Sequence, residues 1–274
     1  MNIILPTILI LDSGVGGLSI YYEVKELLPD INYIYVLDNE VFPYGNKKIE
    51  FITARLSAVL NKIQQEAFFS IAILACNTAS TASLLFLRNS FSFPIIGVVP
   101  AIKPATQLTR NGIIGLLATK LTVNGVYTKN LIKTFATNVT VNMIASSKLV
   151  QLAEKKIHGE NISKKRLMII LKPWLQMKKP PDTIILGCTH FPLLLKEFKK
   201  IFLEETVIID SSAAIAKRAF FLMNKQKEFI INKKKNILMK NKNIVYFTKI
   251  DNKTEKLFLV LSKLGFHKCQ KIII

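Results

Sequence analysis

The chain has 274 residues, of which 50% are hydrophobic and 20% charged, so it can bury the core of one large domain or of two compact ones and is not intrinsically disordered. The formal net charge of +20 does not by itself assign a polyanionic partner, because about half of the excess lies in the last fifty residues. Three cysteines without a regular spacing exclude a disulfide framework and fit a reducing compartment.

The first predicted element is a buried strand over residues 7–12. The apolar run that contains it, "IILPTILIL" (3–11), is short, is interrupted by Pro6 and Thr7, and has no basic residues before it. It therefore indicates neither a signal peptide nor a membrane span, and we expect a cytoplasmic protein without a membrane partner. A glycine-rich turn follows the strand and leads into an amphipathic helix over residues 18–28.

Short apolar runs then alternate with helix-length amphipathic segments. Further strands are predicted over residues 33–38, 71–75, 95–98, 113–117, 139–143, 183–187, 206–209 and 244–248, and helices over 49–67 and 147–159. This alternation is typical of α/β folds with mostly parallel sheets covered by helices on both faces. Nine strands are many for one sheet, and "GVVPAIKPA" (97–105) provides a crossover. We expect two similar α/β domains, residues 1–98 plus 210–274 and an inserted 99–209, with the active site in the cleft between them.

One short pattern occurs twice in the chain. "AILACNT" (72–78) and "IILGCTH" (184–190) each end a buried strand with a small residue and a cysteine, and each precedes a predicted helix. Ligands of open parallel sheets bind beyond the carboxyl ends of the strands. A helix N-terminus there favours a thiolate and offers a site for a carboxylate. The repetition therefore predicts that Cys76 and Cys188 belong to two related halves and face one ligand.

Two like thiols at one site suit the inversion of a stereocentre, in which one thiolate removes a proton and the opposite thiol delivers one to the other face. Three alternatives remain: two ordinary core cysteines, a redox-active pair, and a zinc site built from Cys76, Cys188 and His190. The cysteines lack a CxxC motif and no ligand spacing favours zinc, so we expect no metal. Because the two contexts match, we favour the acid/base pair over core cysteines.

Five motifs together resemble those of the glutamate racemases in the aspartate/glutamate racemase family. They are "LDSGVGGLS" (11–19), "FPYG" (42–45), "ACNTAS" (75–80), "GLLAT" (115–119) and "LGCTHFPLL" (186–194), and the resemblance spans residues 7–222. It implies a cofactor-independent enzyme that interconverts L- and D-glutamate by a two-thiol mechanism and supplies D-glutamate for peptidoglycan. A racemase for another amino acid, such as aspartate, is the alternative within this class.

The resemblance also implies roles for individual residues. Cys76 would act on the D-enantiomer and Cys188 on the L-enantiomer, with Asp12 and His190 assisting the two thiols. The implied substrate-binding positions are Asp12, Ser13, Tyr44, Gly45, Asn77, Thr78, Thr189 and His190. Each side chain in this set could instead serve in a turn or a helix cap, and that alternative stays open.

Two further acids are candidates for assisting catalysis, Asp38 at a predicted strand end and Glu154 in a predicted helix. The family has an assisting acid near Glu154, but one sequence does not fix its register, and an exposed glutamate is the ordinary expectation there. No lysine motif for a pyridoxal Schiff base stands out, which fits the absence of a cofactor.

The C-terminal region departs from the family pattern after about residue 222. From residue 225 onward there are 13 Lys and 3 Asp or Glu, and Cys269 has no partner motif, so we expect it to be a bystander. The lysines raise the alternative of a basic DNA- or gyrase-binding protein. Since neither interleaved aromatic residues nor a nucleic-acid-binding motif accompanies them, we favour a solvated surface. The expected partner is a small-molecule substrate, and a homodimer is compatible with the sequence.

Overall fold

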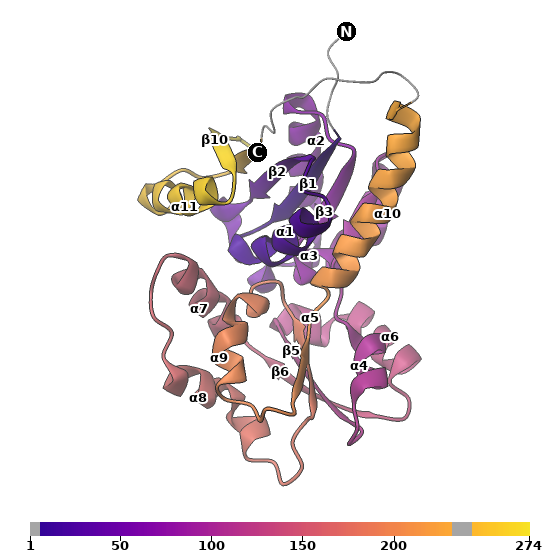
Figure 1. Ribbon diagram of the computed structural model, residues 1–274, viewed down its shortest axis with the longest axis vertical. Coiled ribbons are helices and arrows are strands. Elements are labelled where there is room, and N and C mark those ends of the chain that lie inside the picture. Colours follow the sequence, from indigo (N-terminus) through magenta and orange to yellow (C-terminus); the bar gives the residue numbers. More distant parts are fainter. Residues whose placement is uncertain (1–5, 232–242) are drawn as a thin grey trace.

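The apolar runs of the sequence form two separate parallel sheets, which lie in two lobes of the molecule (Figure 1). The structure is a computed structural model that describes residues 6–231 and 243–274, with side chains described up to residue 225 in the first range. The predicted α/β fold with two parallel sheets flanked by helices is confirmed. The lysines at positions 233–235, 240 and 242 of the predicted basic region lie outside the described residues.

The upper lobe in Figure 1 contains a six-stranded sheet with the order β10-β9-β2-β1-β3-β4. Its strands are β1 (Thr7–Asp12), β2 (Asn32–Leu37), β3 (Ile71–Leu74), β4 (Ile95–Gly97), β9 (Asn243–Phe247) and β10 (Phe266–Lys271). Alternate residues of β1 enter different cores, since Ile8 and Ile10 face one side of the sheet while Leu9 and Leu11 face the other. Helices α1 (Leu18–Leu27), α10 (Ser212–Ile231) and α11 (Asn252–Lys263) cover the first side, and α2 (Ile49–Glu66) and α3 (Asn77–Ser90) cover the second.

The lower lobe contains a four-stranded sheet with the order β6-β5-β7-β8. The strands are β5 (Ile113–Ala118), β6 (Thr140–Ala145), β7 (Thr183–Gly187) and β8 (Val207–Ile209). One side is covered by α7 (Ser147–Ile157), α8 (Lys164–Leu175) and α9 (Leu195–Lys199), and the other by α4 (Ile102–Leu108), α5 (Lys120–Asn124) and α6 (Val126–Phe135). Four 3-10 turns complete the order: η1 (Val15–Gly17), η2 (Asn39–Val41), η3 (Tyr44–Asn46) and η4 (Phe191–Leu194).

The nine predicted strands all form, and β9 returns to the first sheet beside β2. The prediction missed β10, because "FHKCQK" has no continuous apolar run and pairs along only one side, with β9. The prediction of a helix directly after Cys188 was wrong. There the chain forms η4, which carries Pro192, and only then the short helix α9. The N–H groups of Phe191 and Leu193 bond to carbonyls three residues earlier, those of Cys188 and His190, which is the tighter 3-10 pattern.

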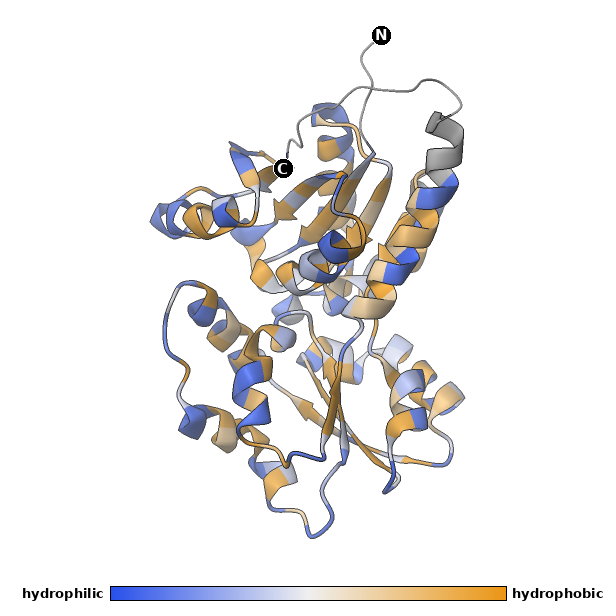
Figure 2. Cartoon of the chain, viewed as in Figure 1, coloured by the Kyte–Doolittle hydropathy of each residue, from blue (hydrophilic) through white to orange (hydrophobic). Residues whose placement is uncertain are grey.

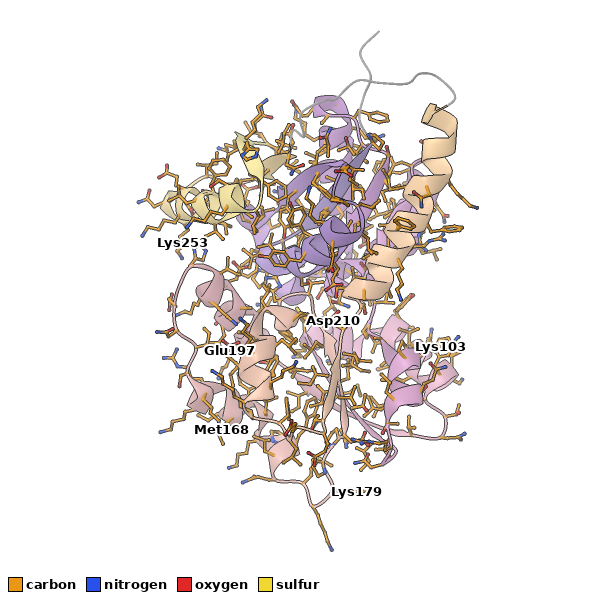
Figure 3. All side chains as sticks on the ribbon, viewed as in Figure 1. Lys103, Met168, Lys179, Glu197, Asp210 and Lys253 are labelled. Carbon is orange, nitrogen blue, oxygen red and sulfur yellow. The ribbon has the colours of Figure 1, made fainter. Side chains whose placement is uncertain are left out.

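Polar and charged side chains cover the outside of both lobes. Figure 2 shows hydrophobic residues along the strands of both sheets, and Figure 3 shows Lys103, Lys179 and Lys253 at the periphery of the molecule. Since the first two belong to the lower lobe, exposed positive charge is not restricted to the C-terminal region. None of the described helices is long and apolar enough to cross a membrane.

Stability should depend on the central strands rather than on the exposed helical positions. Ile73 lies in β3 and is fully buried, whereas Leu85 on α3 is 77% exposed. We expect Ile73→Ala to lower the free energy of unfolding by about 2–5 kcal/mol, because it leaves a cavity in the core. Leu85→Ala should change it by less than about 0.5 kcal/mol. Urea denaturation followed by circular dichroism compares the two, and equal midpoints would contradict this account of the core.

Candidate active site

The two predicted thiols lie at the carboxyl ends of β3 and β7, where the lobes meet. The Oγ1 of Thr189, which follows Cys188, donates a hydrogen bond of 2.9 Å to the carbonyl of Ala75, which precedes Cys76. This bond holds the ends of the two strands together across the lobe boundary. Both thiols are buried, with Cys76 8% and Cys188 5% exposed. The third cysteine, Cys269, lies apart on β10.

The glycine-rich turn after β1 lets the lobes approach each other. A Cβ atom at Gly16 would overlap the imidazole of His190 and crowd the hydroxyl of Thr189, and one at Gly14 would overlap the carboxylate of Glu154. Any other residue at these two positions would therefore push the second lobe away. The glycines leave room for the side chains of Glu154, Thr189 and His190 of the opposite lobe.

Asp12 ends β1 and is fully buried beside this turn. Its carboxylate accepts hydrogen bonds from the N–H of Ser13 at 2.6 Å and of Gly17 at 2.7 Å, so it does cap the turn. Burial raises the pKa of Asp12 to about 6, although the nearby His190 opposes this rise. A cationic partner, such as an ammonium group, would therefore stabilise the anionic form of Asp12.

Cys76 occupies the N-cap position of α3, as expected from the sequence. Burial and the neighbouring Asp12 raise the pKa of the Cys76 thiol well above its usual range. The backbone N–H groups of Ala79 and Thr78 oppose this rise without overcoming it. The expectation that the helix N-terminus would lower this pKa is thus wrong, because desolvation outweighs the helix contribution.

Cys188 has a different environment, since no α-helix begins directly behind it. Its Sγ lies 3.9 Å from Nδ1 of His190, and the other ring nitrogen of His190 lies 2.8 Å from Oε1 of Glu154. Burial alone would lower the pKa of His190, but Cys188, Glu154 and Asp12 together raise it well above its usual value. These contacts favour the imidazolium form of His190, which lies where it can stabilise a thiolate at Cys188.

Of the two candidate acids, Glu154 belongs to this site directly. Besides facing His190, its Oε1 accepts a hydrogen bond of 2.9 Å from the N–H of Val15 in the opposite lobe. Asp38 is fully buried and instead binds Arg55 and the hydroxyl of Tyr44. That hydroxyl is thus already committed to Asp38, and what Tyr44 and its neighbour Gly45 can offer a ligand are backbone N–H groups. Neither N–H has an acceptor in the described part of the chain.

Asn77 and Thr78 begin α3 beside Cys76, and both are buried. The Nδ2 of Asn77 has no hydrogen-bond acceptor among the described residues, which a bound ligand would supply. The Oγ1 of Thr78 lies 2.9 Å from that of Thr119 in the lower lobe, and Thr122 lies near both. Sequence reasoning missed Thr119 and Thr122 as site residues. Only Thr119 had a signal, because it closes the "GLLAT" motif.

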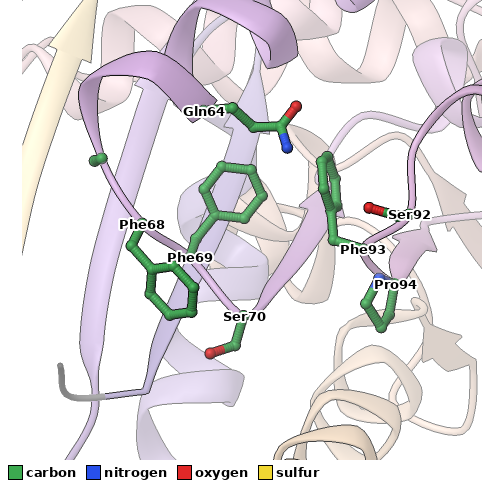
Figure 4. A pocket seen from close by; sticks show the side chains of 8 residues that line it. Gln64, Phe68, Phe69, Ser70, Ser92, Phe93 and Pro94 are labelled. Atoms are coloured by element: carbon green, nitrogen blue, oxygen red, sulfur yellow. The ribbon is translucent and has the colours of Figure 1, made fainter.

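Two cavities lie at different distances from the thiols. One of about 630 Å³ lies between α7 and α11, and its lining includes Glu154 and Phe42. The other, of about 390 Å³, is shown in Figure 4 and lies next to Ser70 and Pro94. These two residues precede β3 and β4, so the second cavity lies at the opposite end of the sheet from the thiols. Among the described residues, no cluster of three or more His, Cys, Asp or Glu could hold a metal ion.

The protonation of His190 should depend on Glu154. We expect Glu154→Gln to lower the pKa of His190, because the variant loses the negative charge that favours the imidazolium. The chain has three histidines. His158 directly follows α7, the helix that carries Glu154, and provides an internal reference. NMR titration of the histidine ring protons measures the shift, with Glu160→Gln as the control. An unchanged His190 titration in Glu154→Gln would contradict the assigned contact.

Known proteins resemble this chain over nearly its whole length. The family described as Asp/Glu/Hydantoin racemase matches residues 9–219. A protein named glutamate racemase from Photorhabdus laumondii is 52% identical over 268 residues, which cover 98% of this chain and 91% of that protein. One of the same name from Yersinia pestis is 50% identical over 267 residues, with 97% and 91% covered.

Solved structures agree with these sequence relatives. The crystal structure of Escherichia coli glutamate racemase in complex with L-glutamate and the activator UDP-MurNAc-Ala has a TM-score of 0.90 and 47% identity, and 98% of each chain is covered. Glutamate racemase isoform RacE1 from Bacillus anthracis gives a TM-score of 0.79 at 27% identity, covering 98% of this chain and 97% of that one. The motifs, the fold and these relatives agree: the chain belongs to the Asp/Glu/Hydantoin racemase family.

Proposed function

We propose that this protein interconverts L- and D-glutamate by proton transfer at Cα through Cys76 and Cys188. The observation that carries the proposal is the placement of two buried thiols on opposite lobes, joined by the bond between Thr189 and Ala75. The relatives named glutamate racemase, at about half identity over nearly the full length, support glutamate as the substrate. D-glutamate made in this way would supply peptidoglycan synthesis in the cytoplasm.

In the L-to-D direction, Cys188 acts as the base. The imidazolium of His190 stabilises its thiolate, which takes the proton from Cα so that the C–H bond breaks and an S–H bond forms. Cys76, whose thiol is kept protonated by burial and by Asp12, then donates its proton to the opposite face of the carbanion. The thiolate left at Cys76 is the base for the reverse direction, and no cofactor is required.

The proposed substrate contacts follow from groups that lack partners or carry charge. Asp12 binds the ammonium group, and the Nδ2 of Asn77 and the N–H groups of Tyr44 and Gly45 bind carboxylate oxygens. The hydroxyls of Ser13 and Thr78 line the same boundary. Thr189 already donates to Ala75, so its hydroxyl oxygen remains as an acceptor for a ligand.

Closure of the two lobes would exclude water from this site. We place the domain boundaries at residues 98/99 and 209/210, which assigns the six-stranded sheet to one domain and the four-stranded sheet to the other. Substrate would enter between the lobes, where the larger cavity reaches Glu154. A homodimer fits this arrangement, and light scattering of the purified protein decides between it and a monomer.

Incubation with L-glutamate in heavy water tests the reaction. We expect D-glutamate with deuterium at Cα without any added cofactor, because the delivered proton comes from an exchanged thiol. Cys76→Ser and Cys188→Ser should each lower racemisation by more than about a thousandfold, since a serine hydroxyl is a far weaker acid and base. Cys269→Ser, which alters the remaining thiol, should leave the rate unchanged.

Near wild-type turnover in either active-site variant would exclude the two-thiol mechanism. Running the same assay with L-aspartate separates the two substrate classes. Racemisation of aspartate in preference to glutamate would assign the protein to the other activity within this family.

Substrate affinity should weaken at acidic pH. Because the pKa of Asp12 is raised to about 6, the carboxyl is mostly anionic above that pH and mostly neutral below it. His190 has a pKa well above its usual value and keeps its charge throughout this range. The dissociation constant of D-glutamate, measured calorimetrically with Cys76→Ser, should therefore rise about tenfold per pH unit below 6. Adding Asp12→Asn should remove this dependence, and a dependence that persists would exclude Asp12 as its cause.

A further inference from the structure

A buried ion pair between Asp38 and Arg55 adjoins the segment of residues 39–46. This segment, which we call the 39–46 loop, contains η2 and η3 and connects β2 to α2. Asp38 precedes it and is fully buried, and Arg55 of α2 lies 12% exposed behind it. The pair requires an explanation, because burying charges is costly unless the geometry is good and their polar atoms are satisfied.

The guanidinium of Arg55 binds both oxygens of the Asp38 carboxylate. Nε of Arg55 donates to both oxygens of Asp38, at 3.1 and 3.0 Å, and Nη2 donates to Oδ1 at 2.8 Å. The same Nη2 also donates to Oε2 of Glu40 at 2.7 Å. Arg55 thus holds the residue before the loop and a residue within it, which a lysine could not do with the same planar geometry.

Asp38 also connects Arg55 to Tyr44, near the C-terminal end of the loop. Its Oδ2 accepts a hydrogen bond of 2.7 Å from the hydroxyl of Tyr44, whose ring is almost fully buried. Burial and the negative charge of Asp38 raise the pKa of Tyr44 well above its usual range, so the phenol stays a donor at all relevant pH values. The side chain of Tyr44 is fixed from behind, and its backbone is therefore fixed as well.

The loop meets the site at several points. The N–H groups of Tyr44 and Gly45 have no acceptor among the described residues. Gly45 packs against Thr119 of the other lobe, and the ring of Phe42 lies 5.9 Å from that of His190, centroid to centroid. A shift of the loop would thus move the proposed carboxylate donors and the ring that covers His190 together.

We propose that Arg55 is a positioning residue, which fixes the 39–46 loop through Asp38 and Glu40 and so sets substrate affinity without touching substrate. The inference rests on the proposed function, since it assumes that the Tyr44 and Gly45 N–H groups bind a substrate carboxylate. It gives Asp38 a structural task in place of proton transfer. The loss of Arg55 should weaken binding more than it slows the chemistry.

Steady-state kinetics of Arg55 variants tests this assignment with both glutamate enantiomers. Arg55→Met should raise KM about tenfold, the cost of misplacing one donor to a carboxylate, with kcat changed less than about threefold. Arg55→Lys keeps the positive charge but not the forked set of donors, so its KM should lie between those of the wild type and Arg55→Met. Lys62→Met is the control, because Lys62 on the same helix pairs only with the exposed Glu66 among the described residues, and its KM should be unchanged.

Removing Arg55 leaves Asp38 buried and unpaired, which could unfold the protein. The double variant Arg55→Met/Asp38→Asn removes that charge while the amide oxygen can still accept from Tyr44, so it should fold and still show the raised KM. A lowered melting temperature with fewer active molecules but a wild-type KM would overturn the proposal and leave Arg55 a purely structural residue. A wild-type protein that does not racemise glutamate would instead refute the proposed function itself.

Discussion

The hydrogen bond from Thr189 to the carbonyl of Ala75 is the contact on which the site depends, because it joins the ends of strands from two different sheets. Parallel strands gather their carboxyl ends at one edge, so each lobe alone offers only half of the chemistry. The bond aligns these two edges with one thiol on each side. Other contacts across the boundary depend on the same close approach of the two lobes. They include the contact of Glu154 with Val15 and that of Thr78 with Thr119.

The two thiols share a residue type but not an environment. Cys76 is buried near Asp12, and both burial and that carboxylate favour the neutral thiol. Cys188 lies beside a histidine held in its charged form by Glu154. This difference suits the proposed reaction, in which one cysteine donates a proton as a thiol and the other removes one as a thiolate.

Much of this arrangement was predictable from local patterns. The strands are apolar runs between turn residues, and the cysteines stand at their ends, so the fold class and the two thiols follow from the order of residues. The partner of His190 did not follow, because Glu154 reaches it from a helix thirty-six residues earlier in the chain. The pairing of Asp38 with Arg55 depends on how a helix packs beside a loop, which no sequence pattern specifies. The turn after Cys188 and the polar strand β10 were likewise decided by tertiary context rather than by local preference.

The position of β10 gives some of the C-terminal lysines a physical role. This strand is at one edge of the six-stranded sheet, and its side away from β9 has no strand partner in the described part of the chain. Such an edge exposes a row of N–H and C=O groups that could template strands from other molecules. Lys268 and Lys271 stand exposed along it, and a second molecule pairing there would bring like charges together. Lys268 and Lys271, whose surroundings in sequence resemble a polyanion-binding region in composition, would therefore oppose pairing of this edge with a second molecule.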